Sequence, residues 1–188
     1  HPSYITLNRD YVSMSTFNTY NSQNNYNSFI MGNSRSIFYE VSDWEQFLDR
    51  NKKCFHLDAS GESLYGIYKK IKYLDSNIDR ISNVLLILDY STLSRVEPRE
   101  GHWTMTAPQL VNNQEFIKFQ LVFLKTFFRP QFFLAFFDLK LFGQVRDYMK
   151  EHALIDDNPL NYEVSSNEIR LTAFETMMAK DENLYYKS

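Results

Sequence analysis

Three short polar turns follow apolar runs of the sequence and carry residue types suited to acyl-transfer chemistry. They are Gly32-Asn33-Ser34-Arg35-Ser36, Ser60-Gly61-Glu62 and Asp89-Tyr90-Ser91. In an open parallel sheet, ligands bind beyond the carboxyl ends of the strands, where such turns converge. A serine in a tight turn between strand and helix can direct its hydroxyl into that crevice, while backbone N–H groups face a developing oxyanion. Glycines at 32 and 61 would allow close backbone approach.

The apolar runs before these turns indicate buried parallel strands at residues 29–31, 54–57 and 84–88. Between the second and third runs, apolar residues recur at steps of three and four. This spacing predicts a helix with one buried stripe, and Lys69, Lys70 and Lys72 lie mostly outside that stripe. The stripe comprises Leu64, Ile67, Tyr68, Ile71 and Leu74.

A further helix is predicted between the first two strands. Ser42-Asp43-Trp44-Glu45 has the form of a capping box, with Ser42 as N-cap and Glu45 reaching back, so a helix is expected to begin here and to run to about Arg50. Strand and helix then alternate at the spacing of successive right-handed crossovers. The favoured architecture is a three-layer α/β fold, a parallel sheet flanked by helices.

The length of 188 residues suits one core-bearing unit, so residues 1–188 are expected to form a single α/β domain. Residues 1–27 are rich in Asn, Ser, Thr and Tyr without a periodic apolar pattern, which predicts an irregular lead-in. Residues 95–150 form an aromatic-rich helical insertion that Pro130 breaks into two helices. This insertion is either a helical hairpin packed on the sheet or a partly exposed lid that holds an acyl chain or contacts a membrane surface.

The three turns resemble the sequence blocks of the SGNH (GDSL-type) hydrolase superfamily. Gly32-Asn33-Ser34 is similar to the first block, Gly-Asp-Ser, and Gly61 matches the glycine of the second block. The resemblance implies a flavodoxin-like SGNH hydrolase fold, Ser34 as nucleophile, and an oxyanion hole made by N–H groups of Ser34 and Gly61. Residues 32–36 are also similar to the Gly-x-Ser-Arg-Ser phrase of a bacterial envelope-associated subgroup, which is linked to acyl groups on surface polysaccharides.

Two departures from the family pattern bear on catalysis. The third block usually supplies an Asn donor, whereas this chain has Asp89, an acceptor when ionised. The last block is Asp-x-x-His, yet none of His56, His102 and His152 has an aspartate three residues before it. A serine without a base is a weak nucleophile near neutral pH. The base is therefore expected outside this chain, in a missing C-terminal part, or the protein is not a hydrolase.

Composition limits the classes of partner and of site that the chain is expected to have. The formal net charge is −3, which gives no reason to expect nucleic acid as a partner. The single cysteine, Cys54, excludes a disulfide within the chain and a cysteine-based zinc site, and neither a cofactor nor a metal site is predicted. Charged residues interrupt the most apolar region, so no membrane helix is expected. The chain begins with His1, which suggests a processed or engineered start that a signal or anchor could have preceded.

Two hypotheses remain open. The first is a hydrolase or acyltransferase of the bacterial cell envelope that acts on an acylated carbohydrate or another ester through Ser34. The second is a non-catalytic envelope or carbohydrate-binding domain on the same scaffold, which would explain both Asp89 and the absent base. Ser34 as a plain turn serine and His56 as a satisfied buried histidine are the structural alternatives. Fold alone does not choose between these hypotheses.

Overall fold

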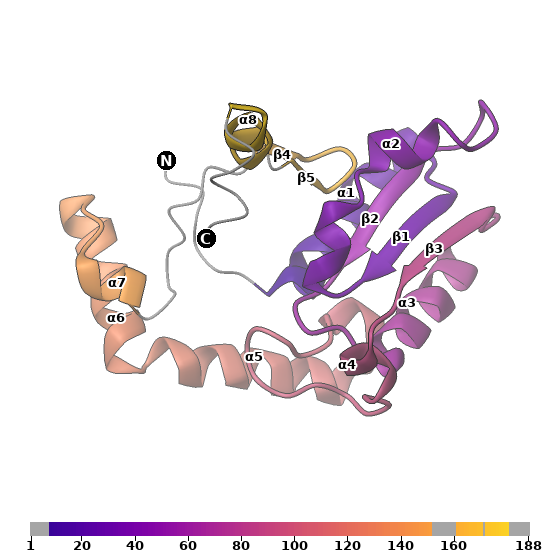
Figure 1. The fold of residues 1–188 in the computed structure, drawn as a ribbon. Helices are drawn as coiled ribbons and strands as arrows, with labels where there is room; N and C mark the ends of the chain where they lie inside the picture. Colours follow the sequence, from indigo (N-terminus) through magenta and orange to yellow (C-terminus); the bar gives the residue numbers. More distant parts are fainter. Residues whose placement is uncertain (1–7, 152–160, 171, 181–188) are drawn as a thin grey trace.

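A parallel sheet of three strands organises the computed structural model, which describes residues 8–151, 161–170 and 172–180. The strands are β1 (Ser28–Gly32), β2 (Cys54–Asp58) and β3 (Asn83–Ile87), in the order β2-β1-β3 (Figure 1). Both pairings of β1 are parallel, which confirms the predicted arrangement. Gly32 lies opposite Asp58 on β2 and Ile87 on β3, so the three strands end at the same edge.

Helices flank both faces of the sheet at β1 and β2. Val84 and Leu86 of β3 stay 37–39% exposed, so this strand is half-buried rather than buried as predicted. On one face, α1 (Arg9–Asn24) and α3 (Leu64–Asn77) enclose the larger core, where the rings of Phe17 and Phe29 meet edge to face at 5.9 Å between centroids. On the other face, α2 (Val41–Glu45) packs over Ile30 and Cys54. The chain is therefore an α/β protein with a parallel sheet flanked by helices.

Helix α1 corrects the prediction of an irregular lead-in over residues 1–27. The helix has no clear apolar face. Its two capping residues and the packing of one core residue hold it in place. The Asn8 side chain accepts a hydrogen bond from Tyr11 N (2.8 Å) and donates to the carbonyls of His102 and Met105. Phe17 is buried in the core, and Asn25 ends the helix in the left-handed conformation with φ of 53°. Tertiary contacts here override weak local propensity.

Helix α2 differs from the predicted capping box. It begins at Val41, the capping position is Glu40 without a side-chain cap, and it ends at Glu45 rather than near Arg50. Ser42 lies inside the helix, and its N–H and hydroxyl each donate to the carboxylate of Glu168, both at 3.3 Å. The serine that the local pattern assigned to the cap instead donates to Glu168, which lies 126 residues away in the sequence.

Helix α3 carries a buried lysine that the sequence pattern placed mostly outside the apolar stripe. Lys70 is fully buried, and its ammonium forms ion pairs with Asp10 (2.7 Å) and Glu62 while donating to the carbonyl of Leu57 (3.1 Å). Burial alone would lower the pKa of Lys70, but the two carboxylates raise it above its usual value. Burial raises the pKa of Glu62 against the effect of Lys70.

The remaining described elements lie between the sheet strands or after them in the sequence. They are η1 (Ser34–Phe38), α4 (Tyr90–Leu93), η2 (Pro108–Leu110), α5 (Asn113–Phe127), α6 (Pro130–Phe137), the π-helix η3 (Asp138–Phe142), α7 (Asp147–Glu151), the antiparallel pair β4 (Asn161–Glu163) and β5 (Glu168–Arg170), and α8 (Thr172–Lys180). Pro130 begins α6, which confirms the predicted break between two helices.

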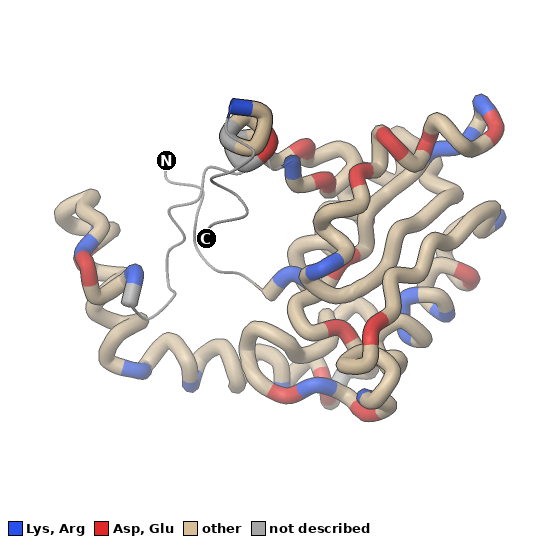
Figure 2. Tube along the Cα trace, viewed as in Figure 1, with Lys and Arg blue, Asp and Glu red and all other residues tan. Residues whose placement is uncertain are grey.

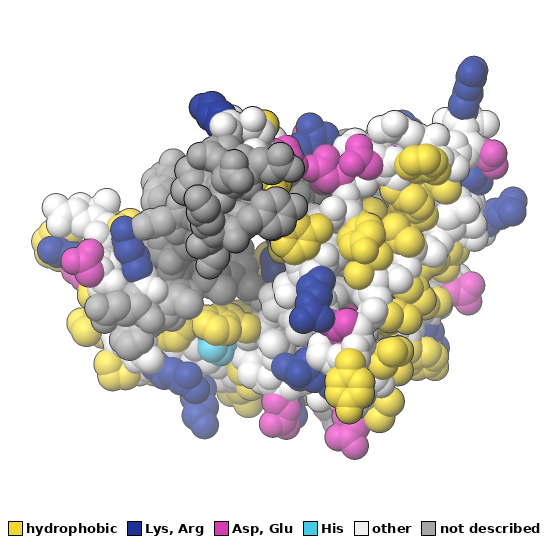
Figure 3. Space-filling model, in the orientation of Figure 1, with side chains coloured by type: hydrophobic (Ala, Val, Ile, Leu, Met, Phe, Trp, Pro, Cys, Tyr) yellow, Lys and Arg dark blue, Asp and Glu magenta, His cyan; other side chains and the backbone are white. Residues whose placement is uncertain are grey.

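Helix α5 runs away from the sheet as an arm, with α6 and α7 at its far end (Figure 1). Lys and Arg residues are spaced along this arm (Figure 2). Hydrophobic side chains are exposed on it (Figure 3). The apolar stripe of α5, defined as Ile117, Leu121, Leu124 and Phe128, is 53–64% exposed. The insertion is thus not a hairpin packed on the sheet. Within the described residues, no helix is long and apolar enough to cross a membrane.

We predict that Lys70→Met lowers the free energy of unfolding by about 3–5 kcal/mol, because it leaves two buried carboxylates without their cation. Lys72→Met is the matched control, since Lys72 is exposed on the same helix, and it should change stability by no more than about 0.5 kcal/mol. Urea unfolding followed by circular dichroism measures both. Equal stability of the two variants would show that Asp10 and Glu62 do not depend on Lys70.

Candidate functional site

The three predicted turns converge at the carboxyl edge of the sheet. Ser34, Gly61 and Asp89 each follow a strand end within two or three residues, and the register aligns those ends. Gly32 is needed at this point, because a Cβ there would lie 2.8 Å from the carbonyl oxygen of Ile87. The backbones of β1 and β3 can approach this closely only with glycine at position 32.

Ser34 opens η1 and is exposed to solvent. The preceding residue, Asn33, caps this short helix, since its side-chain oxygen accepts a hydrogen bond from Arg35 N (2.9 Å). No hydrogen bond to the Ser34 hydroxyl occurs among the described residues. The predicted nucleophile is therefore accessible, but nothing in the described part of the chain activates it.

Asp89, at the predicted third-block position, is tied to Asn33 rather than directed at Ser34. Asn33 Nδ2 donates to Asp89 Oδ2 (2.8 Å) and to Thr92 Oγ1 (3.1 Å), and Arg35 forms an ion pair with the same carboxylate. Asp89 also caps α4 by accepting from Thr92 N (2.8 Å). The hydrogen bond from Asn33, followed by those from Thr92 and Ser91, holds the pKa of Asp89 well below its usual range. Asp89 is thus an ionised acceptor and cannot donate to an oxyanion.

Asn33 and Asp89 are the two positions at which the turns depart from the Gly-Asp-Ser and Asn blocks, and they are hydrogen-bonded to each other. In the family pattern an acid stands at the first position and an amide at the third. This chain has the amide at the first and the acid at the third, and the two form a donor–acceptor pair in which the amide donates. A change to the other residue type at either position alone would break this pair.

Gly61 adopts a left-handed conformation with φ of +61°, which favours glycine. A Cβ at this position would meet Arg99 Nη2 at 3.3 Å, Thr104 Cγ2 at 3.5 Å and Arg95 Nη1 at 3.8 Å. The side of Gly61 where a side chain would stand is thus occupied by residues 95–104. Whether the N–H groups of Ser34 and Gly61 face one oxyanion stays a prediction.

Ser36 and His56 form a buried pair beside Ser34 that the sequence analysis missed. Ser36 Oγ lies 2.9 Å from His56 Nε2 and donates its hydrogen to the carbonyl of Asn33 (2.8 Å). When the single hydroxyl hydrogen is directed to Asn33, His56 Nε2 can only donate to Ser36. In that tautomer the imidazole does not act as a base towards Ser36. The only sequence signal was the second serine of the Gly-x-Ser-Arg-Ser phrase.

His56 is held from several sides, and its burial favours the neutral imidazole. Burial lowers its pKa, an effect that the nearby Asp58 opposes. The turn of the β4–β5 hairpin lies against its backbone, where His56 N donates to Ser166 O (3.0 Å) and Asn167 Nδ2 donates to His56 O. His56 is therefore the satisfied buried histidine of the structural alternative.

Asp58, the last residue of β2, carries a buried ion pair that the sequence pattern did not indicate. Arg9 Nε and Nη2 bind its two carboxylate oxygens at 2.8 and 2.7 Å, and Asn167 Nδ2 donates to it at 3.1 Å. Burial would raise the pKa of Asp58, but Arg9 lowers it below its usual value. These groups fix α1 and the β4–β5 hairpin at the site edge.

The other histidines do not contact Ser34 in the described part of the chain. His102 lies among the rings of Trp103, Phe123 and Phe132. Burial, followed by repulsion from Arg129, lowers its pKa. His152 lies outside the described residues. Among the described residues, no group of three or more His, Cys, Asp or Glu side chains could hold a metal ion.

Comparison of the chain with protein-family models, curated proteins and solved structures found no match.

We predict that the Asn33–Asp89 pair behaves as a coupled exchange. Asn33→Asp places two carboxylates in contact and should lower thermal stability, because like charges at this distance repel. Asp89→Asn in the same chain should restore much of the loss by returning a donor–acceptor pair. Thermal unfolding of the two single variants and the double variant measures the coupling. A double variant whose loss equals the sum of the single losses would contradict the coupling.

We also predict that stability falls as the pH drops below about 6.5, the ordinary pKa of an unfolded histidine. The folded pKa of His56 is lower, so the unfolded chain binds the proton first and stability is lost until the folded pKa is reached. Each such histidine contributes a slope of up to about 1.4 kcal/mol per pH unit. Urea unfolding between pH 7.5 and 5 should show a shallower slope in His56→Gln. His102→Gln measures the separate share of His102, and an unchanged slope in His56→Gln would refute the assignment.

Proposed function

We propose that this chain belongs to a serine-dependent ester hydrolase or acyltransferase with a flavodoxin-like SGNH fold, in which Ser34 is the nucleophile. The observation that carries the proposal is the register of the sheet, which brings the turns of Ser34 and Gly61 to the same edge. A three-stranded parallel sheet in the order β2-β1-β3 is compatible with this fold. Ser36 is committed to buried hydrogen bonds, which leaves Ser34 as the accessible hydroxyl of the turn.

The proposed reaction begins with attack of Ser34 Oγ on an acyl carbonyl carbon. A base removes the hydroxyl proton, the C–O bond to the substrate alcohol breaks, and the same proton passes to the departing alkoxide. N–H groups of Ser34 and Gly61 would hold the oxyanion in between. Water or an acceptor hydroxyl then takes the acyl group from Ser34. In this proposal the base comes from outside this chain.

The substrate class follows from the resemblance at residues 32–36. We place the activity on acyl groups of bacterial surface polysaccharide, or on another ester of the cell envelope. The exposed apolar stripe of α5 supports contact of the arm with a membrane surface. Nucleic acid is not part of the proposal.

The second candidate is a non-catalytic carbohydrate-binding domain on the same scaffold. One observation favours it specifically, because Asp89 occupies the position of an oxyanion donor while being an ionised acceptor. A hole that lacks one donor stabilises the oxyanion less, and loss of a single donor typically costs about 10²–10³-fold in rate.

A fluorophosphonate probe, which labels activated serines, separates the two candidates. We predict slow or undetectable labelling of the chain alone, and no serine-dependent turnover of simple acyl esters, because loss of the base typically costs about 10⁴-fold or more. Imidazole in the buffer should replace the missing base and accelerate labelling at Ser34. Mass spectrometry of the labelled peptide identifies the site.

Two variants make the labelling test specific. Ser34→Ala should abolish the imidazole-dependent signal, whereas Ser36→Ala should retain it. If the probe does not label Ser34 with or without imidazole, the result favours the carbohydrate-binding domain. Rapid labelling without imidazole would mean that a base acts within the chain, and His56, His102 and His152 would then be replaced in turn.

A further inference from the structure

A cavity of about 400 Å³ lies between α5 and the loop of residues 98–106, apart from the turns of Ser34 and Asp89. Tyr65, Met105, Val111 and Val122 contribute its apolar wall. The size suits a small molecule or one group of a larger ligand.

Cationic side chains dominate the polar lining of this cavity. Arg99 comes from the loop, and Lys118, Lys125 and Arg129 come from α5 and the residue that caps α6. On α5, the lining residues recur at steps of three and four, so they share one helix face. Two carboxylates, Glu100 and Glu115, also line the cavity. Glu100 lies 3.7 Å from Lys118 in an exposed ion pair. Arg99, Lys125 and Arg129 form no ion pair with a carboxylate in the described part of the chain.

Buried donor groups without partners stand at the same place. Arg99 Nε and His102 Nε2 are shielded from solvent and make no hydrogen bond within the described part of the chain. A buried polar atom left unpaired typically costs about 1–3 kcal/mol, so such atoms usually have a partner, which can be water or a ligand. An anion with several oxygens could accept from Arg99 Nε and from a hydrogen on His102 Nε2 together.

We infer that this cavity binds an oxyanion of the phosphate type, carried by a small molecule or by a lipid headgroup. Arg99 supplies directed N–H donors, since a guanidinium matches the oxygens of a phosphate. Lys118, Lys125 and Arg129 neutralise its charge. Ser34, Gly61 and Asp89 do not line the cavity, although the Arg99 guanidinium stands beside Gly61. The inference goes beyond the proposed esterase function, because phosphate binding is measured without any reaction at Ser34.

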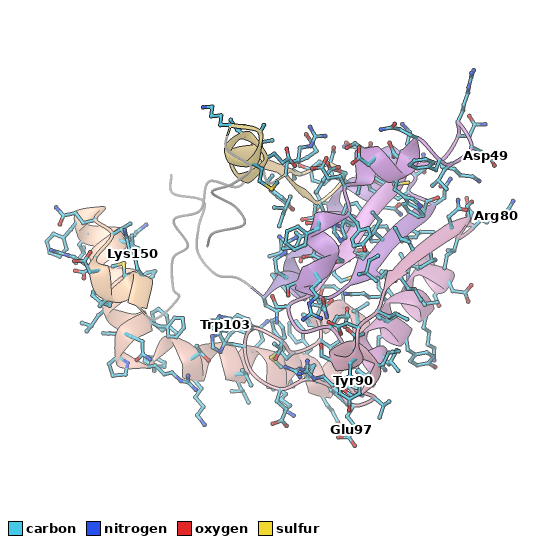
Figure 4. The ribbon with its side chains drawn as sticks, viewed as in Figure 1. Asp49, Arg80, Tyr90, Glu97, Trp103 and Lys150 are labelled. Carbon is cyan, nitrogen blue, oxygen red and sulfur yellow. The ribbon has the colours of Figure 1, made fainter. Side chains whose placement is uncertain are left out.

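Inorganic phosphate is the first probe, titrated against sodium chloride at matched ionic strength. Isothermal calorimetry should show saturable binding, and the ring proton signals of His102 should report a raised pKa as the anion binds. Arg99→Gln and Arg129→Gln should each weaken binding by about tenfold or more. Arg129 is exposed, so its variant serves even if Arg99→Gln fails to fold. Arg80→Gln is the matched control, because Arg80 lies at the opposite end of the sheet (Figure 4).

Vesicles distinguish the two sources of the phosphate group. Phosphatidylglycerol vesicles test the lipid source against phosphatidylcholine vesicles, and the apolar stripe of α5 would lie near such a surface. Binding in either arm that Arg99→Gln or Arg129→Gln weakens, and that Arg80→Gln leaves unchanged, supports the site. The site is refuted if neither phosphate nor anionic vesicles bind, or if binding is equal in all three variants.

Discussion

The buried ammonium of Lys70 is the contact on which the arrangement of this protein depends. It joins α3 to α1 through Asp10, to the turn after β2 through Glu62, and to β2 itself through the carbonyl of Leu57. Asp10 extends the link, since its other carboxylate oxygen accepts from Ala107 N at 2.7 Å. The loop that leads to α5 is thereby fixed to the same ion pairs. A buried charge satisfied on several sides specifies one arrangement, because any other packing would leave a charge unpaired.

Polar groups at the carboxyl edge of the sheet are nearly all paired, and this pairing limits what chemistry the edge can perform. Arg9 neutralises Asp58, Asn33 holds Asp89, and Ser36 shares hydrogen bonds with His56. Such pairs position the turns, but they also remove the carboxylates and the imidazole from catalytic duty. Ser34 takes no part in these pairs and is exposed. The contacts that order the edge are thus the same contacts that engage its buried polar groups.

The sequence predicted the three strands and their parallel order because apolar runs that end at polar turns are a local signal. It also located Ser34, Gly61 and Asp89 at one edge, since that follows from parallel register. It did not predict α1, the role of Ser42 or the burial of Lys70. Each of these depends on a partner distant in the sequence: the loop of residues 102–107, Glu168 and Asp10. Periodicity and capping rules contain no information about such partners.

The outer edges of β2 and β3 are covered to different extents, and this difference limits how copies of the protein could associate. The turn of the β4–β5 hairpin bonds to the backbone of β2 at His56. In the described chain β3 pairs only with β1, so its outer edge has unpaired backbone groups. Strand addition could therefore occur at β3 and is blocked at His56. Two copies that joined their β3 edges about a two-fold axis would pair the open backbone groups of both β3 strands, so association through this edge would stop at a dimer.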